Sequence, residues 1–162
     1  MRFRSKLCAI IPAFLSAACS VSPPKNIKVV NDFDSQRYLG TWYEIARFDH
    51  RFERGLKVVN RGFNTQKQQW QESTGKAYFT GSPQVAALKV SFFGPFYGGY
   101  NVIELDADYR YALVCGPNRG YLWILSRTPT LDAATRDRLV QTAKNNGFDT
   151  DKLIWVKQTQ HQ

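Results

Sequence analysis

Few residues of this sequence could act as nucleophiles, general bases or metal ligands, because its 162 residues include only three cysteines and two histidines. A Ser-His-Asp set would need His50 or His161, and His161 lies in the C-terminal tail. His50 has no second good metal ligand near it in sequence, and the ligands are too few for a multi-zinc protein. The sequence therefore predicts no catalytic residue, no metal site and no cofactor.

The N-terminus has the pattern of a cleaved leader. Basic residues precede an apolar run of about 12 residues, which is too short to span a membrane. The run ends in Leu15–Cys19, which resembles the bacterial lipobox, although Ser16 stands where Leu is usual. The resemblance implies a diacylglyceryl thioether and an acylated amine on Cys19, and Ser20 in place of Asp implies the outer membrane. The alternative is an ordinary signal peptide cut near Ala18, which would leave Cys19 a free thiol.

Removal of the leader would define where the mature chain begins and would lower its formal net charge. Residues 1–18 would be a lipoprotein signal peptide, 19–28 a lipidated N-terminus and semi-rigid tether, and 29–162 one folded domain. The formal net charge of +9 falls to +6, because the leader holds three basic residues. The basic residues are dispersed, which disfavours nucleic acid as a partner and favours anionic headgroups at a membrane. Cys115 remains as a lone thiol that we expect to be buried.

Composition and periodicity predict an all-β domain. Aromatic residues make up 14% of the chain, and so many rings need a large core or a lined cavity. Short β runs separated by turn residues are typical of an antiparallel barrel or sandwich. One helix is expected over Ala133–Asn146, capped by Thr130 or Asp132 and ended by Gly147. The expected strands are Thr41–Phe48, Lys57–Phe63, Gly75–Thr80, Ala87–Phe93, Gly99–Leu105, Tyr111–Cys115, Tyr121–Arg127 and Leu153–Lys157.

Three short motifs occur in the order of a known barrel family. They comprise Gly40, Trp42 and Tyr43 in the first strand, Asp108 and Tyr109 in a later turn, and Arg127 at the end of the strand before the helix. This set resembles the lipocalin signature, with Ala107 where that family prefers Thr. The wider sequence around the first strand and Phe93–Tyr100 resembles the bacterial outer-membrane lipocalins, which are lipoproteins. The resemblance implies an up-and-down antiparallel β-barrel with one C-terminal flanking α-helix.

The signature residues also have a physical interpretation as scaffold. An aromatic barrel must be closed at one end, or water enters its core, and Trp42 can provide that plug. Arg127 can lay its planar guanidinium across the indole and donate to nearby backbone carbonyls. Gly40 lets the chain turn sharply beneath the barrel.

The lipocalin topology implies that Asp49–Leu56, Gly94–Tyr97 and Gly116–Gly120 surround the open mouth. The first of these is either a solvated loop or a place where a basic side chain meets a phosphate headgroup. The second, with its two aromatic residues, is either a plain turn or an apolar rim where an acyl chain enters. The candidate ligand-binding residues are Phe48, Arg51, Arg54, Phe96, Tyr97 and Tyr100.

One strand of the lipocalin pattern is missing, since only eight residues separate Phe48 from Lys57. An up-and-down barrel closes with an even number of strands, so the loss forces a parallel pair or leaves a seam open. Asp49–Leu56 would cover the gap, or Lys57–Phe63 would replace the lost strand with Thr65–Ser73 as its return. Otherwise exposed edges would invite pairing with a second copy as a homodimer. We expect an irregular or open seam after the first strand.

Three functions follow as hypotheses. The lipocalin resemblance implies a module that binds fatty acids or lysophospholipids, for lipid storage or transport in envelope maintenance, anchored to the outer membrane at its periplasmic face. A truncated lipocalin with a compromised cavity would instead have a structural or interaction role. An enzyme using Cys115 as nucleophile is disfavoured, because no His, Lys or helix N-terminus near it in sequence would lower its pKa.

Overall fold

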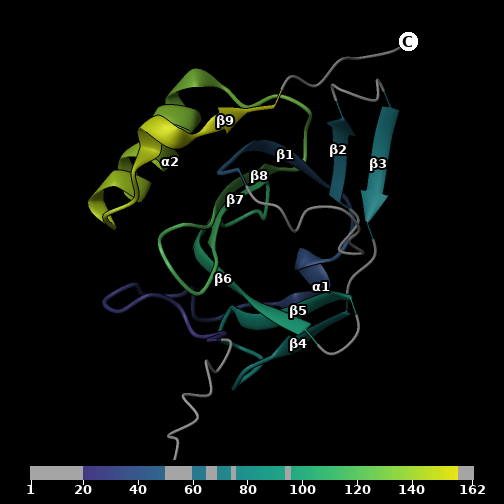
Figure 1. Cartoon of the computed structure of the whole chain (residues 1–162), viewed down its shortest axis with the longest axis vertical. Coiled ribbons are helices and arrows are strands. Elements are labelled where there is room, and N and C mark those ends of the chain that lie inside the picture. Colours follow the sequence, from purple (N-terminus) through teal and green to yellow (C-terminus); the bar gives the residue numbers. More distant parts are fainter. Residues whose placement is uncertain (1–19, 50–59, 65–68, 74–75, 94–95, 157–162) are drawn as a thin grey trace, which may run out of the picture.

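The computed structural model describes residues 20–49, 60–64, 69–73, 76–93 and 96–156, and strands are its main regular elements (Figure 1). Each strand expected from the sequence overlaps an observed one, whereas the short α1 and η1 were not expected. The elements are α1 (Ser35–Tyr38), β1 (Trp42–Arg47), β2 (Asn60–Asn64), β3 (Gln69–Ser73), β4 (Lys76–Phe79), β5 (Ala87–Phe93), β6 (Phe96–Leu105), β7 (Tyr111–Cys115), β8 (Leu122–Ser126), α2 (Ala133–Asn145), η1 (Thr150–Lys152) and β9 (Ile154–Trp155).

The strands form one curved sheet in the order β3-β2-β1-β8-β7-β6-β5-β4, with β9 added beside β1. Neighbouring strands from β8 to β4 are antiparallel, and so are β1 and β8. Figure 1 shows the sheet curling into a ring, with α2 lying outside it. The predicted all-β barrel with one flanking C-terminal helix is therefore confirmed.

The seam after β1 is irregular, as predicted. β2 runs parallel to β1 and pairs with it only at Trp42–Asn60 and Tyr43–Arg61. β3 pairs antiparallel with β2. This hairpin corresponds to the alternative in which Lys57–Phe63 replaces the lost strand and Thr65–Ser73 returns beside it. The ordered path ends at β3 and β4, and no pair between them closes the ring among the described residues. The alternative that residues 49–56 cover the gap stays a prediction, because residues 50–56 lie outside the described part of the chain.

The helix α2 forms where its caps predict it. The carboxylate of Asp132 accepts a hydrogen bond from the Thr135 N–H at 2.9 Å. Gly147 follows the helix with a φ of +80°, a conformation that glycine adopts without strain. Leu139 and Ala143, four residues apart on one face, are fully buried against the barrel.

Two apolar clusters lie on opposite faces of the sheet. The outer core packs α2 and Phe148 against alternate residues of β7 and β8. The inner cluster is drawn from strands around the ring and from Phe33, so it lies inside the barrel. Alternation along β7 separates them: Leu113 and Cys115 face α2, whereas Ala112 and Val114 face inward.

The segment before α1 packs on the barrel along much of its length, which differs from the tether expected over residues 19–28. Pro24 and Ile27 are buried, and Val30 donates to the Val102 carbonyl at 2.9 Å. This packing depends on tertiary contacts. Apolar residues of the proline-containing segment pack on the sheet, and no local sequence pattern predicts that contact.

Candidate functional site

The floor of the barrel is closed by Trp42 and Arg127. Trp42 is fully buried, and the Arg127 guanidinium carbon lies 3.8 Å from the centre of its ring system. Arg127 also donates to the carbonyls of Thr41 at 2.9 Å, Arg37 at 2.8 Å and Tyr109 at 3.2 Å. The planar guanidinium therefore joins β1, the residues around α1 and the turn before β7. This is the contact between Arg127 and Trp42 that the sequence led us to expect.

The turn before β7 is fixed by a buried carboxylate. Asp106 accepts hydrogen bonds from Arg110 Nε at 2.7 Å and Nη2 at 2.9 Å. These bonds hold the pKa of Asp106 well below its usual range. The turn places Tyr109, whose φ is +60°, so that its hydroxyl accepts a hydrogen bond from the Asp34 N–H at 2.9 Å. The turn is therefore connected to the start of α1.

Above the floor lies a pair of phenols. The hydroxyls of Tyr38 and Tyr100 are 2.8 Å apart, and the Tyr38 ring lies 4.8 Å from that of Trp42. Burial raises the pKa of Tyr100 to about 12 and raises that of Tyr38 as well. Both phenols are therefore neutral at physiological pH, and they place a hydrogen-bonding pair beside the apolar side chains of the inner cluster.

The walls around this pair are apolar. They carry aromatic rings and branched or small apolar side chains. The members of the inner cluster are Phe33, Trp42, Ala86, Val102, Tyr109, Ala112, Val114 and Leu125, with Val30, Tyr38, Phe79, Tyr100, Leu105 and Trp123 packed against them. Such a lining suits a ligand with a long apolar part.

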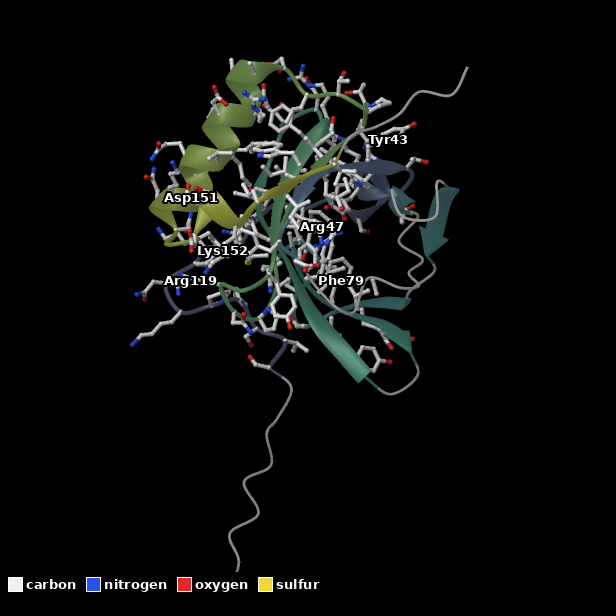
Figure 2. The ribbon with its side chains drawn as sticks, turned by 45° about the horizontal axis from the view of Figure 1, so that its top comes forward. Tyr43, Arg47, Phe79, Arg119, Asp151 and Lys152 are labelled. Carbon is white, nitrogen blue, oxygen red and sulfur yellow. The ribbon has the colours of Figure 1, made fainter. Side chains whose placement is uncertain are left out.

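One ion pair faces the same interior. Glu44 and Arg47 are three apart and would lie on opposite faces of a regular strand. A register shift between Glu44 and Ala46 inserts the extra residue of a β-bulge, so Arg47 Nε reaches Glu44 Oε1 at 3.0 Å. Arg47 is also directly opposite Trp123, which packs on the inner cluster. Figure 2 shows Arg47 and Phe79 within the ring of strands.

Sequence reasoning missed this ion pair. Glu44 is 9% exposed, a rare position for a carboxylate without a charged neighbour. The three-residue spacing of Glu44 and Arg47 did not predict an ion pair, because a regular strand would place the two side chains on opposite faces. Only the cross-strand register reveals the bulge.

The predicted ligand residues have different surroundings. Tyr100 faces the interior beside Tyr38, and Tyr97 is partly buried near Tyr78. Phe48 is 5% exposed in the outer core, with its ring 6.4 Å from Phe148. Phe96 is the first residue of β6, and its side chain lies outside the described part of the structure, as do Arg51 and Arg54 entirely.

A surface cavity of about 380 Å³ lies beside Phe48. Arg119 spans its rim, donating to the carbonyls of Asn146 at 2.8 Å and Lys25 at 3.1 Å. Figure 2 shows Arg119, Asp151 and Lys152 on the same side of the molecule as α2. Arg119 therefore joins the N-terminal segment to the end of α2, and no residue that lines this cavity belongs to the inner cluster. Its lining is Phe48, Asp49, Arg119, Gly120, Asp149 and Lys152.

Cys115 is buried, as the sequence predicts. It is 0% exposed and belongs to the outer core rather than the barrel interior. Burial raises the pKa of its thiol to about 12. The thiol is therefore protonated at neutral pH, and the sheet separates it from the inner cluster.

Among the described residues, no helix has the length and hydropathy needed to cross a membrane.

A closed aromatic floor, an apolar cluster inside the ring of strands and a helix outside the ring are the features of a lipocalin. A family model of the lipocalin-like domain matches residues 33–158, and the chain belongs to this family. Two similar relatives, both called outer membrane lipoprotein Blc, come from Citrobacter freundii and Escherichia coli (strain K12). They are 58% and 57% identical over 98% of this chain and 98% of their own. Among solved structures, lobster apocrustacyanin A1 has a TM-score of 0.59 at 20% identity, covering 78% of this chain and 81% of that chain, which supports the fold alone.

The alignments also record the shortened chain. Each of the two bacterial alignments runs over 174 residues, whereas this chain has 162, so at least 12 aligned positions of each relative have no residue here.

Proposed function

We propose that this lipocalin binds fatty acids or lysophospholipids in its barrel and serves lipid storage or transport in the cell envelope. The observation that carries the proposal is the interior itself. An acyl chain would lie along the inner apolar cluster, and the Glu44–Arg47 pair at 3.0 Å offers charged partners for an anionic or zwitterionic head.

The outer membrane is the location that the relatives support, since both are called outer membrane lipoproteins. A diacylglyceryl group on Cys19, together with an acylated amine, would anchor the protein stably, where a single chain binds only marginally. We place the domain on the periplasmic face, where it meets lipid that moves between membranes.

The test is native mass spectrometry of the purified mature chain. We expect a co-purified species with the mass of a fatty acid or lysophospholipid, and its return after stripping and incubation with that lipid. Arg47→Met should weaken binding of an anionic lipid about tenfold, the size of one charge-assisted hydrogen bond. Arg136→Met is the matched control, because Arg136 lies on the exposed face of α2. A chain that stays empty after incubation contradicts the proposal.

An empty barrel would instead favour a structural or interaction role. The observation behind this second candidate is the open path of the sheet, which ends at β3 and β4. Unpaired strand edges can add a further strand from a second copy as a homodimer. Catalysis by Cys115 has no comparable support, because its thiol is buried and its pKa is raised to about 12. Cys115→Ser should leave lipid binding unchanged.

A further inference from the structure

The N-terminal segment, residues 20–31, joins the barrel almost immediately after Cys19. The backbone of Val21 lies against β6, so closely that a Cβ added at Gly99 would be 2.4 Å from the Val21 carbonyl oxygen. Val30 then continues the contact, accepting from the Ala86 N–H at 2.9 Å. Two residues of chain span at most about 7 Å, so a lipid on Cys19 must enter the membrane close to Gly99.

One exposed and two half-buried side chains, those of Tyr78, Lys89 and Tyr97, surround this point. Tyr78, Lys89 and Gly99 are directly opposite one another across β4, β5 and β6, and therefore share a face of the sheet. Tyr100, the neighbour of Gly99, faces the inside of the barrel, so this shared face is the outer one. Tyr97, two residues before Gly99, faces the same way.

These side chains touch one another. The rings of Tyr78 and Tyr97 are 6.0 Å apart in an edge-on arrangement, and Lys89 Nζ lies 5.2 Å from the centre of the Tyr97 ring. Tyr78 is 47% exposed, which is unusual for a large ring beside a folded segment. We call Tyr78, Lys89 and Tyr97 the tyrosine–lysine patch.

We propose that the tyrosine–lysine patch is the surface on which the anchored domain rests against the membrane, with anionic headgroups as its partner. Tyrosine favours the membrane–water interface, where its ring lies among apolar groups and its hydroxyl stays hydrated. Lysine is attracted to anionic lipid. The N-terminal segment itself carries Lys25 and Lys28 and no carboxylate, so its own charge is positive.

This inference rests on the proposed lipid anchor at Cys19 and adds an orientation to it. Because residues 20–31 are packed on the sheet, the free linker is too short for the domain to swing away. The face of β4, β5 and β6 then lies toward the membrane, and α2 lies on the far side of the ring (Figure 1).

The test is maleimide labelling of the full, lipidated chain in vesicles of phosphatidylglycerol and phosphatidylethanolamine. Tyr78→Cys places a thiol in the patch, and Gln141→Cys places one on the exposed face of α2. Cys115 is 0% exposed and does not compete for the label. We expect the thiol at 78 to react about tenfold more slowly in vesicles than in the unanchored Cys19→Ser chain, and the thiol at 141 to react equally in both.

The outcomes separate the anchor from the orientation. A chain that floats with the vesicles but reacts equally fast at both positions overturns the orientation and leaves the anchor intact. A chain that does not float removes the anchor, and the orientation with it. Added Lys89→Glu should speed the reaction at 78 in the anionic vesicles, and an unchanged rate would remove the headgroup contact. Neither readout depends on a lipid inside the barrel.

Discussion

The two edges of β1 are held in different ways. Along one edge, β8 pairs antiparallel from Tyr43 to Arg47. The other edge is divided, with β2 parallel at Trp42 and Tyr43 and β9 antiparallel at Ala46 and Arg47. The complete edge joins strands that share the outer core with α2, whereas the divided edge carries two short partners.

The difference shows that this barrel does not depend on continuous strand pairing at every position. A ladder of two residue pairs is weak by itself, so side chains must hold the divided edge. Trp42 pairs with Asn60 of β2 on the divided edge, is fully buried and carries the Arg127 guanidinium on its ring. We therefore expect the seam to depend on this plug more than on hydrogen bonds between β1 and β2.

Trp42→Ala should have the largest effect, a loss of about 3–5 kcal/mol in the free energy of unfolding. The substitution empties a fully buried site and removes the ring beneath Arg127. Urea unfolding followed by far-ultraviolet circular dichroism measures it. Trp155→Ala is the control, because Trp155 is 45% exposed on β9, and its cost should stay below about 1 kcal/mol. Equal losses would mean that the plug does not support the seam.

Amide exchange should show the contrast directly. We expect amides of β2, which pairs with β1 in only two places, to exchange about 100-fold faster than those of β7. β7 is paired along both edges, with β6 and β8. Hydrogen–deuterium exchange followed by mass spectrometry resolves the two strands. Similar protection in β2 and β7 would contradict a weakly held seam.

Two adjacent glycines test whether the N-terminal segment belongs to the folded domain. Gly99→Val should cost about 1–3 kcal/mol, because even a Cβ there would overlap the Val21 carbonyl at 2.4 Å. Gly98→Val is the matched control, with open space at the same point. Urea unfolding and cleavage of the segment by protease both report the change. If the two variants behave alike, the contact with Val21 does not hold the segment in place.

The smallest effect should come from the turn that supports the floor. The folded-state pKa of Asp106 lies below its unfolded value because Arg110 stabilises the carboxylate. Its contribution is therefore present above pH about 4 and is lost as the pH falls below that value. We expect about 1 kcal/mol, limited by solvent around Arg110. Urea unfolding at pH 7 and pH 2.5 measures the loss, which Asp106→Asn should abolish and Asp137→Asn should leave unchanged.

Local signals predicted much of the fold. Asp132 and Gly147 marked the ends of α2, and short β runs bounded by turn residues located β5 to β8. No such local signal marked the bulge between Glu44 and Ala46. From there each side chain of β1 is shifted by one position, which is why Phe48 packs in the outer core. A bulge is set by the partner strand, so β1 alone does not reveal it.

The sequence by itself determined the family, the positions of most strands and of α2, and the plug of Trp42 and Arg127. These depend on short motifs and turn residues, which act locally. Only the tertiary structure decided that β2 runs parallel to β1, that Glu44 meets Arg47 inside the barrel, and that the N-terminal segment packs on β6. These features arise when residues far apart in the chain compete for the same strand edge or the same buried space.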